Sequence, residues 1–403
     1  MPILHYLETV KFTRVIWLLS LVSMFNDIAS EMLYPIIPLY LAQIGLTVTH
    51  IGFLEGLAEI TAGISKGYFG NLSDHLGRRM PFIRAGYILS ATSKPLMALF
   101  QFAGWIFLSR TADRFGKGLR TAARDAMLAA EAGPGNKARV FGFHKAWDTV
   151  GAILGPVAVL VILQQQLVSL RDTFFIAFIP GIFSIGLLFL LKDKPLPKSD
   201  KQKPGFFSFF KYWKHSPPVY KRMLAGVIVF FLFNSSDIFL LLRSRELMGN
   251  NEGAMFITIK AYIIYNIVFA LFSYPAGALA DRLNKKLIYI AGLLLFALVY
   301  GGMAMATTEW HIYLVFGLYG LYAAATDGVL KAWISNISPG AEQATALGLA
   351  ASCQNLAAML ASFAAGIIWS AYGAQTVFLL SAGVTLAVAF YFILAVPRGE
   401  SST

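Results

Sequence analysis

Long apolar stretches separated by short polar breaks run along the whole chain of 403 residues. A helix that crosses a membrane needs about 20 mainly apolar residues, and twelve stretches reach that length. The first is too long for a cleavable signal peptide and passes Pro35 and Pro38 without a small-residue cleavage site. The pattern predicts an all-α integral membrane protein. We expect its helices over residues 14–42, 49–72, 81–102, 104–130, 138–164, 172–192, 221–248, 254–280, 285–306, 309–336, 343–371 and 374–396.

The composition supports a membrane protein and excludes several other classes. Hydrophobic residues make up 57% of the chain and charged residues only 13%, whereas soluble domains carry about 25% charged residues. Disordered chains and ordinary soluble enzymes are therefore excluded. The single Cys353 excludes disulfides and thiolate clusters, and the six histidines lack zinc-type spacing. We expect no metal and no cofactor.

Positive charge is concentrated in one loop. Of the net charge of +12, a large part comes from nine Lys and Arg residues between Lys192 and Arg222, opposed by Asp193 and Asp200. Basic residues mark the cytoplasmic side of membrane proteins. The alternate breaks, around residues 46–50, 101–104, 307–311 and 372–375, contain no Lys or Arg. We expect both termini and this loop in the cytoplasm and the chain in the cytoplasmic (inner) membrane. Arg171 is the clear exception.

The basic loop also carries aromatic residues. Phe206, Phe207, Phe209, Phe210, Tyr212 and Trp213 alternate with Lys211 and Lys214, a combination typical of a segment lying at the membrane surface. No aromatic-basic nucleic-acid recognition module surrounds the loop, so we expect no nucleic-acid partner.

Three pairs of positions indicate an internal duplication. Phe25-Asn26 recurs as Phe233-Asn234, Gly70 to Arg79 recurs as Gly277 to Lys286, and Gly142 recurs as Gly348, with offsets of 208, 207 and 206 residues. Duplicated halves are common in transporters. We expect a six-helix bundle over residues 1–192, a basic linker over 193–220 and a second six-helix bundle over 221–403.

The segment from Gly70 to Arg79 carries a family resemblance. It reads Gly-Asn-Leu-Ser-Asp-His-Leu-Gly-Arg-Arg between the second and third helices. This resembles the loop signature of the major facilitator superfamily, Gly-x-x-x-Asp-(Arg/Lys)-x-Gly-Arg-(Arg/Lys). His75 occupies a usually basic position, and Asn284 replaces the glycine in the second copy. The resemblance extends over residues 14–396 and implies two six-helix bundles around a central cavity.

The resemblance implies that the charges of this loop keep the cytoplasmic side of the protein closed. Glycine allows close helix contact, and the charges pair with helix ends and acidic groups. We expect Asp125 to be the partner of Arg78; the alternative is that these charges only set topology. The expected cytoplasmic gate consists of Gly70, Asp74, Arg78, Arg79, Asp125, Gly277, Asp281 and Arg282.

The fourth helix carries a stripe of charges at residues 110, 113, 114, 117, 120 and 124, which follow helical spacing. Arg114-x-x-x-Gly118 resembles the fourth-helix motif of the superfamily, whose buried arginine is linked to proton coupling. Lys117 and Arg120 exceed that pattern. Because intramembrane charge is costly in lipid, this stripe faces a wet cavity or acidic partners. A purely structural ion network is the alternative.

Acidic residues at similar depth on other helices are candidate partners for this stripe. A carboxylate placed between desolvation and a nearby cation can act as a proton switch. We expect proton coupling at Asp27, Glu31, Arg114, Asp148 and Asp237, with Asp27 or Glu31 as the protonated group. The expected substrate cavity comprises Asp27, Glu31, Glu55, Glu59, Arg110, Asp113, Arg114, Lys117, Arg120, His144, Lys145, Asp148, Asn234, Asp237, Lys260 and Asp327. Lys260, Asp327 and Lys331 are weaker candidates because helices eight and ten allow local pairing.

The fifth helix contains Gly151-Ala-Ile-Leu-Gly155-Pro156. This resembles part of the Gly-x-x-x-Gly-Pro motif of superfamily antiporters, but the glycines expected further along are absent. Close helix packing explains the small residues equally well.

These features together predict a secondary transporter and not an enzyme. The leading interpretation is proton-coupled efflux of a small organic solute by a monomer. The alternatives are proton-coupled or facilitated uptake of an anionic nutrient or metal chelate, and a receptor that transports nothing. No nucleotide-binding fingerprint is present, and the identity of the solute is not encoded in these motifs.

Overall fold

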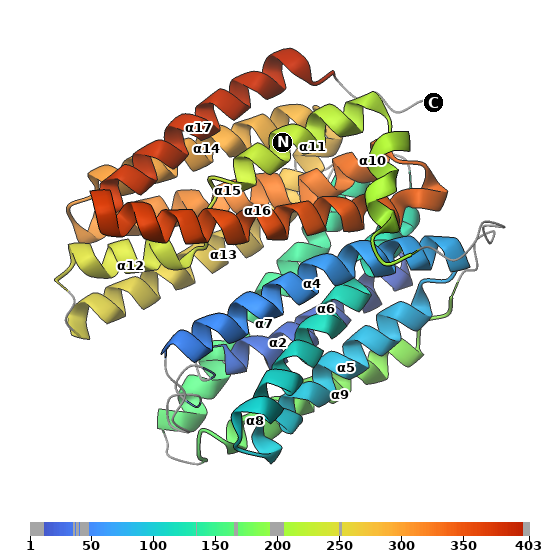
Figure 1. Cartoon of the computed structure of the whole chain (residues 1–403), viewed down its shortest axis with the longest axis horizontal. Helices are drawn as coiled ribbons and strands as arrows, with labels where there is room; N and C mark the ends of the chain where they lie inside the picture. The colour runs from blue at the N-terminus through green and yellow to red at the C-terminus, as the bar shows by residue number, and fades with distance from the viewer. Residues whose placement is uncertain are drawn as a thin grey trace, which may run out of the picture. The chain divides into compact units, whose positions relative to one another are not determined.

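A computed structural model of the chain describes residues 12–34, 37, 40, 48–133, 135–164, 168–193, 205–249 and 252–397. The described regular elements are helical, and their order is shown in Figure 1. From the N-terminus to the central loop they are α2 (Arg14–Leu33), α4 (Val48–Leu76), α5 (Met80–Leu99), α6 (Ala103–Glu131), α7 (Lys137–Gln164), α8 (Asp172–Ile176) and α9 (Phe178–Phe189). The loop holds η1 (Ser208–Lys211) and α10 (Tyr212–His215). The remaining elements are α11 (Pro218–Phe231), α12 (Ile238–Leu247), α13 (Glu252–Arg282), α14 (Lys285–Met305), α15 (Glu309–Ile337), η2 (Gly340–Glu342), α16 (Gln343–Tyr372) and α17 (Ala374–Ala395).

Helices lie over all twelve expected stretches, and two of the stretches are interrupted. The 172–192 stretch is divided into α8 and α9. Pro180 lacks the N–H that would bond the carbonyl of Ile176, which explains the division. In the first stretch, most positions from 35 to 42 lie outside the described residues.

The 221–248 stretch, predicted as one helix, is broken between α11 and α12. The break contains Asn234, Ser235, Ser236 and Asp237, whose short polar side chains compete with helical backbone bonding. The N–H of Ser236 donates to the Ser362 hydroxyl at 3.0 Å. The expectation of a continuous seventh helix is therefore wrong, because four consecutive polar residues open its backbone.

Eight helical segments in the described part of the chain are long and apolar enough to cross a membrane. They are Arg14–Leu33, Lys137–Leu163, Asp172–Phe189, Lys260–Arg282, Lys285–Met305, Glu309–Ile337, Gly340–Tyr372 and Ala374–Ala395. Large apolar side chains such as Phe183, Phe363 and Leu394 are exposed on these helices, as expected for a lipid-facing surface.

The chain forms two compact units. Unit 1 contains Met1–Asn136, Phe143–His215 and Pro339–Ser352, and unit 2 contains Lys137–Gly142, Ser216–Ser338 and Cys353–Thr403. In unit 1, α4 and α5 pack on α6, and α2 packs on α9; in unit 2, α13 and α14 pack on α15, and α14 on α17. The boundary between His215 and Ser216 falls inside the predicted linker.

The short helices of the central loop pack against α4. Phe209 in η1 is fully buried. A Cβ added to Gly67 would stand 2.3 Å from the Phe209 ring. Phe206, Phe207, Phe210 and Trp213 remain exposed. This exposed aromatic face is the part of the loop expected at the membrane surface. Residues 194–204 of the loop lie outside the described residues.

Candidate functional site

The charged stripe of α6 is largely buried within unit 1. Arg110, Asp113, Arg120 and Arg124 are buried, Arg114 is half-buried and Lys117 is exposed. Small residues on α6 allow this packing. A Cβ on Gly116 would stand 2.7 Å from the Gly86 carbonyl of α5, and one on Gly118 would stand 2.4 Å from Ser65 of α4. The sequence therefore brings three helices close around a charged strip.

Asp113 is the centre of one cation cluster. The Ser90 hydroxyl donates to its Oδ1 at 2.5 Å. Lys94 Nζ lies 3.7 Å and Arg110 Nη1 3.5 Å from its oxygens. Lys94 also donates to the Ser90 carbonyl at 2.9 Å. Our sequence analysis did not name Lys94, although a lysine in the middle of the apolar 81–102 stretch is a signal of a buried functional charge.

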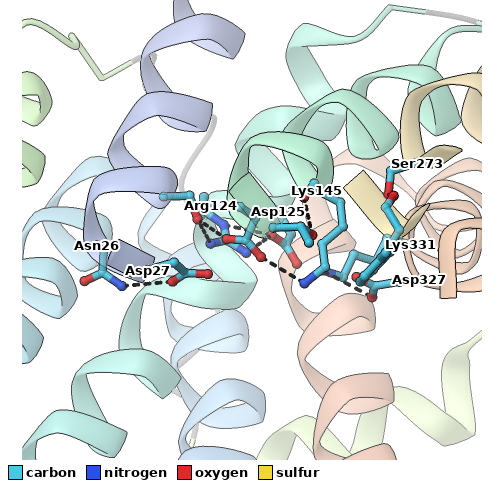
Figure 2. Close-up of polar contacts among 12 residues, drawn as sticks. Asn26, Asp27, Arg124, Asp125, Lys145, Ser273, Asp327 and Lys331 are labelled. Carbon is cyan, nitrogen blue, oxygen red and sulfur yellow. Dashed lines mark hydrogen bonds and ion pairs between the residues drawn. The ribbon is translucent and has the colours of Figure 1, made fainter. Parts of the chain in front are cut away.

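A second network joins α2, α6 and α7 through Ser23. The Ser23 hydroxyl donates to Asp148 Oδ1 at 2.6 Å and accepts a hydrogen bond from Arg124 Nη1 at 3.1 Å. Arg124 also donates to the Tyr87 hydroxyl at 3.3 Å and pairs with Asp125 at 2.9 Å. Figure 2 shows Arg124 beside Asp125. Ser23 and Tyr87 were not predicted, because hydroxyls carry no distinctive signal in an apolar sequence.

Asp27 and Asp148 form a carboxyl pair between α2 and α7. Their carboxyl groups lie close enough to act on each other, and Ser23, one turn before Asp27 on α2, donates to Asp148 at 2.6 Å. Lys145 Nζ contacts the second oxygen of Asp148 at 2.9 Å, and Asn26 donates to Asp27 at 3.3 Å, as Figure 2 shows. The buried His144 also acts electrostatically on Asp148. The structure thus brings together four residues that the sequence analysis had placed in one cavity.

Glu31 lies one turn beyond Asp27 on α2. The charges of Lys117 and Arg114 on α6 act on its carboxylate. The stripe of α6 therefore reaches α2 at this level, and its exposed member, Lys117, lies near an acidic group.

The glycines of the fifth expected helix hold α7 against α2. A Cβ on Gly151 would stand 2.4 Å from the Met24 carbonyl, and one on Gly155 would stand 2.7 Å from the Ile28 carbonyl. Pro156 lies within α7 without ending it. These contacts set the spacing at which Asp27 and Asp148 meet.

The first copy of the loop motif contacts the start of α16. Asp74 Oδ2 accepts hydrogen bonds from the Thr345 N–H at 2.7 Å and the Thr345 hydroxyl at 2.9 Å. Arg79 Nη2 lies 3.6 Å from Asp74 and donates to the Gly340 carbonyl at 3.4 Å. A Cβ on Gly70 would stand 2.3 Å from the Ala344 carbonyl. The motif caps a helix N-terminus at close range.

The second copy does the same at the start of α7. Asp281 accepts from the N–H groups of Ala138, at 3.2 Å, and Arg139, at 2.8 Å, and it pairs with Lys285 at 2.9 Å. A Cβ on Gly277 would stand 2.2 Å from the Ala138 carbonyl.

One departure from the motif has a structural reason, and one expected pair needs correction. Gly77 has φ of 61°, which favours glycine, whereas Asn284 is extended and caps α14 by accepting from the Lys286 N–H at 2.8 Å. Arg78 is exposed, as is Arg282. The expected Arg78–Asp125 pair is replaced by Arg79–Asp74 and Arg124–Asp125, because Arg79 is the buried arginine of the loop.

In unit 2 the broken seventh helix presents Asn234 and Asp237 to tyrosines of α15. Tyr319 donates to Asp237 Oδ1 at 2.6 Å, and Asn234 donates to the Tyr322 hydroxyl at 3.2 Å. The Tyr319 ring stacks on Tyr265 of α13 at a centroid distance of 5.0 Å. Non-helical backbone at membrane depth occurs where it is buried in protein or lines a cavity. The tyrosine cluster was not predicted.

Two of the weaker cavity candidates, Asp327 and Lys331, pair with each other on α15. Asp327 pairs with Lys331 one turn away at 3.8 Å, as Figure 2 shows, and Lys260 is exposed. The side chains of Glu55 and Glu59 lie outside the described residues. No group of three or more His, Cys, Asp or Glu that could hold a metal is present among the described residues.

Comparison with known proteins identifies the family. The family model of the Major Facilitator Superfamily matches residues 19–264 and 253–403. The chain is 33% identical over 362 residues to the uncharacterized MFS-type transporter MJ1317 of Methanocaldococcus jannaschii, covering 89% of each protein. It is 24% identical over 373 residues to the multidrug resistance protein MdtG of Salmonella paratyphi A, covering 90% of each.

Solved structures have the same fold. The human organic anion transporter MFSD10 (TETRAN) aligns with a TM-score of 0.80 at 18% identity, over 94% of this chain and 99% of that one. The Escherichia coli fucose:proton symporter FucP aligns with a TM-score of 0.77 at 13% identity, over 96% and 98%. The chain belongs to the major facilitator superfamily. It is an integral membrane transporter with the all-α major facilitator fold, and not an enzyme.

Proposed function

We propose that this protein is a proton-coupled secondary transporter that exports a small organic solute by alternating access. The observation that carries the coupling is the proximity of the carboxyl groups of Asp27 and Asp148 between α2 and α7, where Ser23 of α2 donates to Asp148 at 2.6 Å and a Cβ on Gly151 would stand 3.2 Å from the Asp27 Cβ. Two carboxyl groups in such contact hold one proton between them, since two like charges at that distance repel. Lys145 neutralises Asp148 at 2.9 Å, so the proton resides on Asp27.

The carboxyl pair can release its proton when its surroundings change. The pair lies between α2 and α7, and Ser23 connects it to Arg124 of α6. A displacement of α7 or α6 alters the contacts of Asp148 with Ser23 and Lys145. It thereby changes the proton affinity of the carboxyl pair. Glu31, near Arg114 and Lys117, is the second proton-coupling candidate, and Asp237 with Tyr319 is the candidate in unit 2.

Export is favoured by the similarity over 90% of the chain to a multidrug resistance protein. The Gly151 and Gly155 motif is explained by packing on α2, so it adds little to the assignment of direction. The excess of cations on α6 supports a second candidate, uptake of an anionic nutrient or metal chelate together with protons. A receptor that transports nothing is the third.

Flux in proteoliposomes distinguishes these candidates. Vesicles oriented with the cytoplasmic face inside are loaded with fluorescein or ethidium, and the external pH is lowered. Export by proton exchange predicts that one dye leaves the vesicles faster under the gradient. Symport predicts instead that dye supplied outside accumulates in the vesicles. Asp27→Asn and Asp148→Asn remove the response to the gradient, while Asp172→Asn, at an exposed acid, retains it. Dye movement that ignores the gradient in the unmodified protein contradicts proton coupling.

The remaining features of the proposal concern placement. We propose a monomer in the cytoplasmic membrane with both termini and the 193–220 linker in the cytoplasm, since the Lys and Arg excess lies on that side. The partners are the solute, protons and the lipid bilayer, without nucleic acid. Protease access to tags at the two termini, in intact cells and in inverted vesicles, tests this orientation.

A further inference from the structure

Arg120 differs from the other buried cations of α6. Its side chain is 5% exposed, and its Cζ lies 4.4 Å from the centre of the Tyr87 ring. Its Nε and Nη1 atoms are buried and make no hydrogen bond within the described part of the chain. A buried charged donor without a partner costs free energy and calls for an explanation.

Two neighbouring cations of the stripe have acidic partners. Arg124, four residues further on, bonds to Ser23, Tyr87 and Asp125. Arg110, on the preceding turns, pairs with Asp113 at 3.5 Å. Arg120 therefore lacks, within the described residues, the polar partners that Arg110 and Arg124 have, and it is one of the two positions, with Lys117, that exceed the fourth-helix motif.

Cations outnumber carboxylates around Arg120 in the described part of the chain. Lys94, Arg110 and Arg114 all act on the carboxylate of Asp113, and the charge of Arg120 acts on Lys94. Asp27 also acts on Lys94, and Glu31 on Arg114, so three carboxylates face four cations. A group that satisfies Arg120 must be an acceptor, and the local field favours an acceptor with negative charge.

The position of Arg120 is fixed by close packing. A Cβ on Gly86 would stand 2.7 Å from the Arg120 Cβ, so α5 lies directly against the base of this side chain. The Tyr87 ring supports the guanidinium by a cation–π contact. An arginine held in this way loses little further freedom when it binds a planar anion.

We propose that Arg120 binds the anionic group of the transported solute, a carboxylate or a similar oxyanion. This inference rests on the proposed transport function and names its substrate class. Tyr87 connects the anion position to proton coupling, because its hydroxyl bonds Arg124, which bonds Ser23, which bonds Asp148. The bound anion and the carboxyl pair therefore act on one hydrogen-bond network.

Thermal unfolding of the purified, solute-free protein provides the first test. Arg120→Met removes a buried charge whose Nε and Nη1 make no hydrogen bond in the described part of the chain, so the unfolding temperature should stay unchanged or rise. Arg124→Met is the matched control on the same helix, and it should lower the unfolding temperature because it removes the hydrogen bonds that Arg124 donates to Asp125, Ser23 and Tyr87. A decrease for Arg120→Met as large as that for Arg124→Met shows a structural role and overturns the proposal.

Ligand-dependent stabilisation provides the second test. Benzoate, benzenesulfonate, phenyl phosphate and benzylamine share one ring and differ in charge and anion geometry. At least one of the three anions should stabilise the unmodified protein, and benzylamine should not. Arg120→Met should weaken the binding of the stabilising anion at least tenfold, and Arg120→Lys should weaken its binding less. The proposal is overturned if none of the three anions stabilises the unmodified protein, or if an anion stabilises Arg120→Met equally well. Either result leaves proton-coupled transport standing where dye flux responds to the pH gradient.

Discussion

Asp74 and Asp281, 207 residues apart in the sequence, perform the same task at two helix N-termini. Asp74 accepts from the backbone N–H of Thr345 in α16, and Asp281 accepts from those of Ala138 and Arg139 in α7. A carboxylate at a helix N-terminus satisfies free N–H groups and the positive end of the helix dipole. Each motif copy therefore holds a helix that arises in the other half of the sequence.

Removing these caps should destabilise the folded protein. Asp74→Ala leaves the Thr345 N–H and hydroxyl without their acceptor, at a cost of about 1–3 kcal/mol, and Asp281→Ala acts likewise at α7. Glu342→Ala is the control, since Glu342 is an exposed acid next to α16. Thermal unfolding in detergent measures the difference. Equal unfolding temperatures for Asp74→Ala and Glu342→Ala would show that the cap contributes nothing.

Glycine substitutions in α7 should separate packing from other roles. Gly151→Ala places a Cβ 2.4 Å from the Met24 carbonyl, and overpacking of this kind costs about 1–3 kcal/mol. Gly186→Ala in α9 is the control, because no atom lies within 4 Å of its added Cβ. The unfolding temperature should fall for Gly151→Ala and for Gly155→Ala but not for Gly186→Ala. A stable Gly151→Ala protein with altered flux would instead favour the antiporter interpretation of the motif.

Neutralising Asp113 should destabilise the folded protein more than neutralising Lys94. Lys94→Met leaves Asp113 with Arg110 at 3.5 Å and the Ser90 hydroxyl at 2.5 Å. Asp113→Asn removes the carboxylate that Lys94 and Arg110 share, and breaking a buried ion pair by removing one partner costs about 3–5 kcal/mol. We expect the larger loss of stability for Asp113→Asn. The double variant should recover part of it, and additive losses would contradict direct coupling of the pair.

The hydroxyl of Tyr319 should matter at the broken seventh helix. Tyr319→Phe removes the donor to the half-buried Asp237 at 2.6 Å and should cost about 1 kcal/mol. Tyr313→Phe, on the same helix, removes a hydroxyl that donates to Glu309 near the start of α15, where the cost should be within about 0.5 kcal/mol. Comparison of both unfolding temperatures and of dye flux measures the effect. An unchanged Tyr319→Phe protein would exclude a role for this contact.

The fold was predictable from the sequence because its signals are local. Apolar stretches of membrane length place helices over all twelve expected ranges, since lipid requires backbone groups to bond within each segment. The duplication was visible as repeated residues at one spacing, and the caps at Asp74 and Asp281 follow from it. The break after α11 was missed because Asn234 and Asp237 were interpreted as cavity residues on a continuous helix and not as part of an opened backbone.

The pairing of the charges was decided by tertiary structure. The sequence placed Asp27, Asp148 and the α6 stripe in one cavity by type and depth. Only the packing of α7 on α2, at Gly151, makes Asp27 and Asp148 a pair. Likewise, Arg79 and not Arg78 is buried beside Asp74. Among the described residues, Arg124 has hydrogen-bond partners, whereas Nε and Nη1 of Arg120 have none. An ion pair depends on distances of a few ångströms between helices far apart in the sequence, and helical periodicity fixes only the face on which each charge lies.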